Sequence, residues 1–347
     1  MGEFSGKVIR WQKQSGRHGL PWQQTRDPYR RWIAEIMLQQ TQVSAAIPYY
    51  ERFMKRFPSV QSLAAAPEDD VMRLWAGLGY YARARNLIAC ARLIAARGGE
   101  FPKSASELSG LPGIGRSTAA AIAAGCWEEP AAILDGNAKR VFSRFFGVKR
   151  GESESAFTKR LWEIAEREKA LNSCSVYAQG LMDLGATVCV RSKPRCGECP
   201  LSGECKAEAS GAPGEYPGKK IRPPKPVRDA AFLILEREGS WWLVKRPGKG
   251  IWAGLFCLPS VRGKLSESDA EARFPELRET GAGHPVLFGR MEHEFTHFTL
   301  RMTIWKAVAG PGPDQPPGTG KWVPVGDVGE EAVPSPVSRL ASLPVPR

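Results

Sequence analysis

The chain has 347 residues, 42% of them hydrophobic, and a formal net charge of +13. This length exceeds that of one small domain, so we expect two domains that each bury a core. No apolar run approaches the length of a membrane span, and the N-terminus lacks the apolar stretch of a signal peptide. The sequence therefore predicts a cytoplasmic protein without membrane contact.

The basic excess lies in the first part of the chain. Residues 1–225 contain 34 Lys and Arg against 22 Asp and Glu, whereas residues 226–347 contain 15 against 14. A basic surface attracts polyanions, of which nucleic acid is the commonest. Charge alone is equally compatible with a basic protein that has no such partner.

Residues 5–205 show a helical pattern, and no useful length of this part alternates as a strand does. Apolar side chains recur at helical spacing over 29–57, with an expected break at Pro48, and again over 59–79 and 81–99. The first part of the chain is therefore predicted to be all-α.

Glu35 is a single charge within the apolar run WIAEIML. On a helix, Ile33, Ile36 and Met37 surround it, and the loss of solvation raises the pKa of such a carboxyl toward neutrality. A carboxyl with that pKa can act as a proton donor. The alternative is a structural Glu that pairs with an Arg or a helix end, because Glu is seldom buried without a partner.

The segment LSGLPGIGRSTAAAIAAG (108–125) predicts a helix end, a Gly-rich turn and an Ala-rich helix. Gly113 and Gly115 leave backbone amides accessible, and they precede a helix N-terminus whose dipole favours an anion. This pattern favours contact with DNA phosphate without sequence preference. An ordinary helix–turn–helix corner is the alternative.

Asp135 follows an apolar stretch and precedes a helix in AAILDGNAKRVFSRFFG. This position is typical of a helix N-cap. A capping carboxylate near amide donors stays ionised, as a group that faces a cationic transition state must. One acid with a raised pKa and one ionised carboxylate form the usual pair for glycosidic bond cleavage.

Four of the eight cysteines follow one another with the spacing Cys189-x6-Cys196-x2-Cys199-x5-Cys205. A short irregular loop can direct all four thiolates toward one metal centre, which is either a structural zinc or a [4Fe–4S] cluster. Zinc ribbons usually have paired C-x-x-C motifs, and only one occurs here. Four free buried cysteines are the remaining alternative.

Residues 208–227 are rich in Pro, Gly and Lys and predict an extended, basic interdomain linker. The segment DAAFLILEREGSWWLVKRP then predicts two strands around a Glu-Gly turn. FTLRMTIWKAV and GKWVPV are further strand-like runs. The second domain is therefore predicted to be rich in strands, with one or two helices.

Together these features resemble the helix-hairpin-helix DNA glycosylases that carry a [4Fe–4S] cluster, and among them the adenine DNA glycosylase family. The matching stretches in the first part are LPWQ (20–23), EIMLQQTQV (35–43), GLGYYARARNL (77–87), LPGIGRSTA (111–119), LDGN (134–137), MDLGA (182–186) and the cysteine set. GIWAGLFCLPS (250–260) and HEFTHF (293–298) extend the resemblance into the second part.

The resemblance implies a multidomain fold. An all-α glycosylase domain (1–207) would contain the helix-hairpin-helix (108–125) and the iron–sulfur loop (189–205). A linker (208–227) would lead to a C-terminal α/β Nudix-like domain (228–347) that recognises 8-oxoguanine. The catalytic Nudix signature, an Arg-Glu-x2-Glu-Glu run, is absent, so we expect no nucleotide hydrolysis by this domain.

The resemblance also implies a reaction. The protein, expected to be a monomer on double-stranded DNA, would flip out an adenine paired with 8-oxoguanine or guanine and hydrolyse its N-glycosidic bond, which leaves an abasic site. Glu35 would protonate the adenine and then help to activate water, and Asp135 would stabilise the sugar cation beside Asn137. The four cysteines would hold the [4Fe–4S] cluster.

The implied DNA contacts fall into four groups. Trp22 and Gln179 would contact the adenine, and Gln40 and Tyr80 would insert into the base stack. Phe295, Thr296 and His297 would read 8-oxoguanine, although the family has Ser where this chain has Thr296. The remaining implied DNA-contact residues are Thr41, Gly113, Gly115 and Ser117.

Two other functions are weighed against this one. A strand-nicking glycosylase similar to endonuclease III needs a lysine at position 117, where this chain has Ser, and the C-terminal domain also argues against it. A non-catalytic iron–sulfur DNA-binding protein would lack Glu35 or Asp135, and both are present.

Overall fold

A computed structural model describes residues 3–151, 153–218, 224–310, 316 and 319–343 of the chain. Its contacts divide the chain into two compact units. The first unit comprises residues 1–65 and 85–221, and the second comprises residues 66–84 and 222–347. Among the described residues, no helix is long and apolar enough to cross a membrane.

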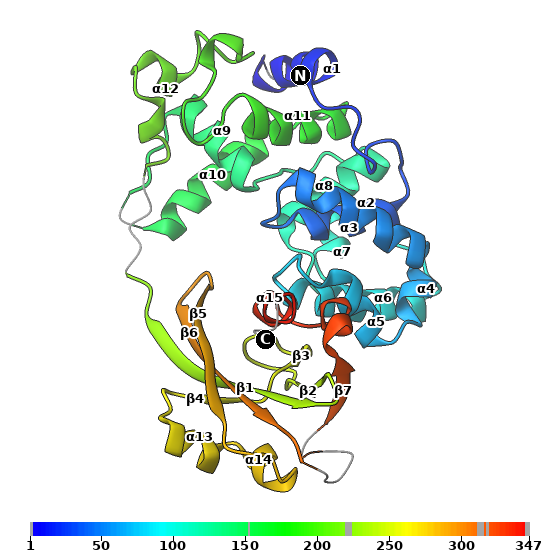
Figure 1. The fold of residues 1–347 in the computed structure, drawn as a ribbon. Helices are drawn as coiled ribbons and strands as arrows, with labels where there is room; N and C mark the ends of the chain where they lie inside the picture. Colours follow the sequence, from blue (N-terminus) through cyan, green and yellow to red (C-terminus); the bar gives the residue numbers. More distant parts are fainter. Residues whose placement is uncertain (1–2, 152, 219–223, 311–315, 317–318, 344–347) are drawn as a thin grey trace. The chain divides into compact units, whose positions relative to one another are not determined.

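The first unit is built from helices (Figure 1). This confirms the predicted all-α character. Helix α6 (Ala82–Ala96) begins in the segment 66–84, which belongs to the second unit, and continues into the first. The other helices of the first unit are α1 (Glu3–Ser15), α2 (Pro28–Leu38), α3 (Val43–Arg56), α4 (Val60–Ala64), α7 (Ala105–Leu108), α8 (Arg116–Trp127), α9 (Gly136–Phe146), α10 (Glu154–Glu168), α11 (Cys174–Thr187), η1 (Cys196–Glu198), α12 (Lys206–Ala209) and η2 (Pro213–Glu215).

The predicted break at Pro48 is wrong, because Pro48 lies inside α3. The chain turns earlier, between α2 and α3, where Gln40 has a left-handed backbone with φ 59°. A proline within a helix removes one backbone hydrogen bond without necessarily ending the helix. The turn is therefore made by the residues around Gln40.

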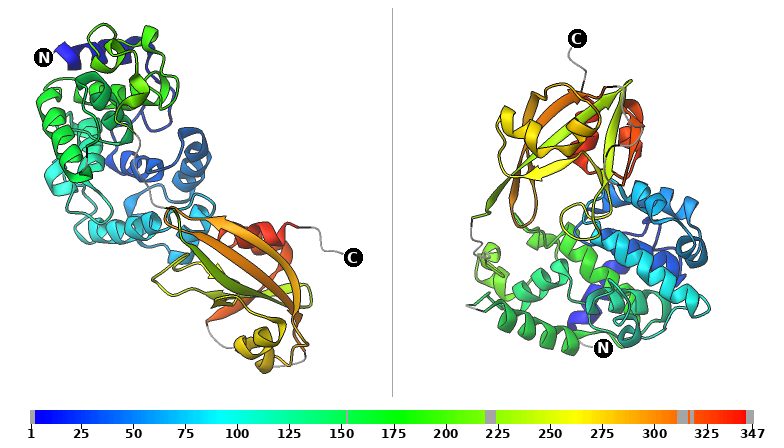
Figure 2. Two further views of the ribbon diagram at one scale, coloured as in Figure 1. Left: turned by 90° about the vertical axis from the view of Figure 1, so that its left-hand side faces the viewer. Right: turned by 90° about the horizontal axis from the view of Figure 1, so that it is seen from below.

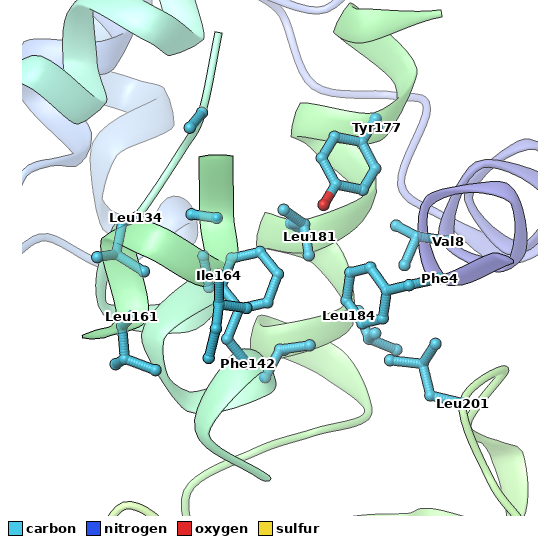
Figure 3. Close-up of a cluster of buried hydrophobic side chains, with 14 of the residues drawn as sticks. Phe4, Val8, Leu134, Phe142, Leu161, Ile164, Tyr177, Leu181, Leu184 and Leu201 are labelled. Carbon is cyan, nitrogen blue, oxygen red and sulfur yellow. The ribbon is translucent and has the colours of Figure 1, made fainter. Parts of the chain in front are cut away.

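A hydrophobic core joins helices that are far apart in the sequence (Figure 3). Phe4 and Val8 of α1 pack with side chains of α9, α10 and α11, among them the fully buried Phe142. A Cβ at Gly180 of α11 would lie 2.8 Å from a methyl group of Val8, so the glycine permits α1 to approach closely. Each large apolar side chain buried here stabilises the fold by about 1.5–3 kcal/mol.

The described start of the predicted linker is not extended. It contains η2, and Pro213 and Tyr216 accept hydrogen bonds from Nε of Arg144 at 3.0 and 3.3 Å. The amide of Arg150 donates to the carbonyl of Pro217 at 2.8 Å. This stretch therefore packs on the first unit, and residues 219–223 of the predicted linker lie outside the described residues.

The second unit contains a seven-stranded mixed sheet with the central order β3-β2-β1-β6-β5, while β4 pairs with β1 and β7 with β2. β1 and β6 are parallel, from Val227 beside Thr299 to Glu236 beside Val308. The strands are β1 (Val227–Arg237), β2 (Ser240–Lys245), β3 (Phe256–Cys257), β4 (Ser260–Arg262), β5 (Val286–Glu294), β6 (Thr299–Val308) and β7 (Gly320–Pro324).

Three of the predicted strand features are confirmed. The Glu-Gly turn joins β1 to β2, with positive φ at both Glu238 and Gly239 as a tight hairpin requires. FTLRMTIWKAV forms β6 and GKWVPV forms β7. The sequence reasoning missed β5, the edge strand of the long β5–β6 hairpin that Figure 2 shows in orange, because its side chains are mostly half-buried or exposed.

Helices complete the second unit. Ala270 of α13 (Glu267–Arg273), Leu277 of α14 (Pro275–Glu279) and Phe274 between these helices are buried. They form one cluster with the fully or nearly buried Leu233, Trp242 and Trp305 of the sheet. The other helices of this unit are α5 (Glu68–Trp75), η3 (Val325–Glu330) and α15 (Ser335–Ala341).

Candidate active site

One cavity of the first unit brings together residues from distant parts of the sequence. Its volume is about 190 Å³, below the roughly 300–1,000 Å³ of sites for drug-sized ligands. Glu35, Asp135 and Asn137, which the sequence predicts to be catalytic, all line it. Four of the predicted DNA contacts also line it: Trp22, Thr41, Ser117 and Gln179.

Glu35 reaches the cavity from α2. Asp27 caps this helix by accepting a hydrogen bond from the amide of Tyr29 at 2.9 Å, and Pro28 occupies its first turn. Ile33 and Ile36 beside Glu35 are buried. Loss of solvation raises the pKa of Glu35 to about 7, against the opposing effect of Arg31 and with a further contribution from the charge of Asp135.

Asp135 caps α9, as predicted, and its Oδ1 accepts a hydrogen bond from the amide of Ala138 at 2.7 Å. Burial raises the pKa of Asp135, while the amides of Ala138 and Asn137 and the charge of Arg140 oppose the increase. The cap therefore favours the charged form but does not outweigh the loss of solvation. Asp135 differs from Glu35 in having amide donors that favour its charged form.

Asn137 is held between α9 and α11. Its Oδ1 accepts a hydrogen bond from Nη2 of Arg140 at 2.8 Å. A Cβ at Gly185 of α11 would lie 2.5 Å from the Cβ of Asn137, closer than real Cβ atoms approach. Gly185, in the motif MDLGA, therefore allows the two helices to meet at Asn137.

Ser117 faces this cavity, and its Oγ accepts a hydrogen bond from the amide of Leu134 at 3.1 Å. It thereby holds the backbone directly before Asp135. Gly113 and Gly115 are exposed at the turn before α8, and Gly113 has φ of +76°. A Cβ at Gly113 would meet the Cβ of Asn86 at 2.7 Å, so this turn requires glycine.

The two residues predicted to insert into the base stack share an unusual backbone. Gln40 and Tyr80 have φ of 59° and 50°, and both side chains are exposed. Non-glycine residues seldom adopt this left-handed conformation, and those that do are concentrated at functional sites.

The loop predicted to read 8-oxoguanine is the tight turn between β5 and β6. The amide of Phe295 donates to the carbonyl of Phe298 at 2.9 Å, and Thr296 and His297 are exposed at the tip. Phe295 is half-buried and stacks on Phe298, with ring centroids 4.6 Å apart. Within this unit, the hydroxyls of Tyr80 and Thr296 lie 3.4 Å apart.

The four cysteines of 189–205 line a second cavity of the first unit. No three Cys, His, Asp or Glu side chains among the described residues are placed to hold a single metal ion. Thiols are donors for both a zinc ion and a [4Fe–4S] cluster, so the four cysteines around this cavity fit either group.

Arg140 and Arg144 of α9 support this segment, and sequence reasoning did not single them out. The buried Arg144 donates to Sγ of Cys189 at 3.3 Å and to the carbonyl of Val190 at 2.7 Å. Arg140 donates to the carbonyl of Cys189 at 2.7 Å. Their signal in the sequence is a pair of cations four residues apart on an amphipathic helix.

Comparison with known families gives three matches along the chain. The HhH-GPD superfamily of base excision DNA repair proteins matches residues 33–167. The iron–sulfur binding domain of endonuclease III matches residues 189–205, and a NUDIX domain matches residues 230–343.

Curated relatives match most of the chain. An adenine DNA glycosylase of Buchnera aphidicola subsp. Acyrthosiphon pisum is 38% identical over 300 residues, which cover 86% of this chain and 85% of the relative. An adenine DNA glycosylase of Homo sapiens is 32% identical over 383 residues, which cover 92% of this chain and 70% of the relative.

Solved structures match the helical part. A thermostable thymine-DNA glycosylase is 29% identical with a TM-score of 0.53, covering 59% of this chain and 95% of that one. A non-covalent endonuclease III–DNA complex, 20% identical with a TM-score of 0.50, covers 60% of this chain and 95% of that one and supports the fold alone.

The fold, the cavity and these matches define an HhH-GPD base excision repair enzyme with a C-terminal NUDIX-like domain, a hydrolase that acts on DNA as an N-glycosylase. Its cofactor is a [4Fe–4S] cluster, as the match of the cysteine segment shows. Within that superfamily, the chain belongs to the adenine DNA glycosylase family. The predicted fold class, enzyme class and cofactor are thereby confirmed.

Proposed function

We propose that this enzyme removes adenine paired with 8-oxoguanine or guanine, leaves an abasic site and does not cut the strand. The observation that carries the proposal is that Glu35 and Asp135 line one small cavity, where burial raises the pKa of Glu35 to about 7. A glycosidase needs one carboxyl that donates a proton and one that stabilises a cationic sugar.

Glu35 is the proton donor in this proposal. With a pKa of about 7, a substantial fraction of Glu35 is protonated at neutral pH. Transfer of its proton to N7 of the flipped adenine lets the C1′–N9 bond break with a neutral base as the leaving group. The resulting carboxylate then accepts a proton from the water that attacks C1′.

Asp135 stabilises the oxocarbenium ion that forms when the bond breaks. The amide of Ala138 holds its carboxyl at the N-terminus of α9 and favours the charged form, so the group is in position before the cation develops. Asn137, fixed by Arg140 and Gly185, lies on the same cavity wall and completes the catalytic set.

Water rather than an amine completes the reaction. The described residues that line the cavity include no lysine, and Ser117 is engaged with the backbone before Asp135. Without an amine to form a Schiff base, water adds to C1′, and the sugar remains in the intact strand as an abasic site.

The DNA contacts extend beyond the base cavity. Gly113 and Gly115 grip a phosphate through their amides, and exposed Gln40 and Tyr80 insert beside the lesion pair. Thr296 and His297, at an exposed turn tip, read 8-oxoguanine. The domain boundaries given above and a monomer on DNA are part of the same proposal.

Cys189, Cys196, Cys199 and Cys205 hold the [4Fe–4S] cluster in this proposal. The cluster supplies a rigid centre for the loop that carries Arg191, Lys193 and Arg195, cations suited to phosphate contact. No step of the glycosidic reaction involves the cluster.

The direct test uses a duplex with a single adenine–8-oxoguanine pair. Purified enzyme should release adenine, and the strand should break at that site only after alkali; Glu35→Gln should bind the duplex without releasing the base. Breakage before alkali would indicate a lyase similar to endonuclease III. Binding without release by the wild type would indicate a non-catalytic DNA-binding protein. Matched duplexes with adenine–guanine and adenine–thymine pairs measure the specificity.

A further inference from the structure

A buried carboxylate outside the catalytic set connects two residues of the cavity wall. Asp183 lies in α11 with a fully buried side chain and does not itself line the cavity. Its Oδ1 accepts hydrogen bonds from Gln179 Nε2 and Arg17 Nε, both at 2.8 Å, and Arg17 Nη2 lies 2.7 Å from the same oxygen. Its Oδ2 accepts from the amide of Arg17 at 2.9 Å.

These bonds fix which way the amide of Gln179 faces. A carboxylate that is paired with the Arg17 guanidinium acts only as an acceptor, so the NH₂ group of Gln179 must face it. The other end of the amide, Oε1, has no hydrogen-bond partner among the described residues. Gln179 lines the cavity, so it offers the bound base a hydrogen-bond acceptor.

The same carboxylate orients a donor beside this acceptor. Arg17 also lines the cavity, and its Nη1 has no partner in the described part of the chain. Because Gln179 and Arg17 bind the same oxygen of Asp183, their polar groups are neighbours. The cavity wall therefore presents an acceptor next to a donor.

We propose that Asp183 is a positioning and specificity residue that sets this acceptor–donor order and thereby selects a 6-amino purine over a 6-keto purine. The inference rests on the proposed function. Adenine presents an amino donor beside a ring-nitrogen acceptor and matches both wall groups. A 6-keto purine presents an oxygen acceptor beside an N–H donor. Its oxygen would face the Gln179 acceptor, and its N–H would face the Arg17 donor.

The central variant is Asp183→Asn, which replaces one carboxylate oxygen by an NH₂ donor. In either orientation the new donor opposes a donor, either the amide of Arg17 or the group formed by the Arg17 side chain and Gln179. Where the NH₂ replaces Oδ1, the amide of Gln179 loses its fixed orientation. Where it replaces Oδ2, it repels the amide of Arg17 and displaces the Arg17 donor instead. The readout is the single-turnover rate on duplexes that carry adenine or hypoxanthine, a 6-keto purine, opposite 8-oxoguanine.

We expect the wild type to prefer adenine, and Asp183→Asn to lower that preference about tenfold or more, chiefly through slower release of adenine. Gln179→Met, of similar size without polar atoms, should also lower it. Gln179→Glu should keep the preference, because a protonated Glu can donate to Asp183 and still offer an oxygen to the base.

The preference for adenine over hypoxanthine distinguishes a specificity role of Asp183 from a purely structural one. If Asp183 only supports the fold, Asp183→Asn slows release of both bases by the same factor, and an unchanged preference overturns the inference. Should Asp183→Asn fail to fold, an unchanged preference in Gln179→Met overturns it equally. If the wild type releases no adenine, both the proposed function and this inference fail. If the wild type releases adenine and only the variants keep an unchanged preference, the inference fails and the proposed function stands.

Discussion

The raised pKa of Glu35 predicts a pH-dependent gain in stability for Glu35→Gln. Burial raises the pKa of this carboxyl from 4.5 to about 7, so the folded protein retains its proton at pH values where the unfolded chain has lost it. Between those two values the native state binds more protons than the unfolded state, and stability falls as pH rises. A glutamine side chain at this position does not ionise, so the substitution removes this loss.

The magnitude follows from the width of that window. Each pH unit within it costs about 1.4 kcal/mol, so the stability difference between Glu35→Gln and wild type should grow by about 2 kcal/mol between pH 5.5 and 7.5. Above pH 7 the difference should stay constant. For a unit of roughly 200 residues, 2 kcal/mol corresponds to about 4–8 °C in the melting temperature.

Thermal unfolding of both proteins with the cluster intact, at pH 5.5, 6.5, 7.5 and 8.5, measures this difference. Glu51→Gln makes the same change at an exposed carboxyl of the same unit and serves as the matched control. A gap between Glu35→Gln and wild type that does not change with pH would refute the raised pKa. The excision rate of the wild type should also fall as pH rises through about 7, because the proton donor is lost.

Three further substitutions test other parts of the site. Asp135→Asn should keep duplex binding but lower the single-turnover rate by about 10³-fold or more; undiminished turnover would remove Asp135 from the mechanism. Gly185→Ala should slow excision, because its Cβ would press on Asn137 at 2.5 Å; Gly283→Ala, where a Cβ meets nothing within 4 Å, is the control. Thr296→Val should weaken the preference for 8-oxoguanine over guanine opposite adenine, while Thr296→Ser should retain it; equal preference in all three proteins would exclude this hydroxyl as the reader.

The two carboxyls of the proposed catalytic pair could be singled out from the sequence because each has a local signal. Glu35 is a charge in an apolar helix, and Asp135 stands where a helix begins, so both environments are set within one or two turns of chain. The cysteine spacing indicated a metal centre in the same way. The choice between zinc and a cluster needed the family match of this segment.

The supporting residues could not be predicted, because their partners are distant in the sequence. Asp183 binds Arg17, which lies 166 residues earlier, and Arg144 donates hydrogen bonds to carbonyls of the cysteine segment. Strand β5 was missed for a related reason. Its pairing with β6 forms the strand, whereas its own side chains give little hydrophobic signal.

The arrangement of α9 explains how a short helix can serve both the catalytic end and the iron–sulfur segment. Asp135 caps its first turn, Asn137 follows in that turn, and Arg140 and Arg144 project one and two turns later. Arg140 binds Asn137 and the carbonyls of Gly185 and Cys189, so one guanidinium joins three chain segments. Helical spacing places these groups along one rigid element, and side chains on a packed helix are held more precisely than side chains on loops. The cysteine segment therefore supports the position of Asn137 through hydrogen bonds to α9.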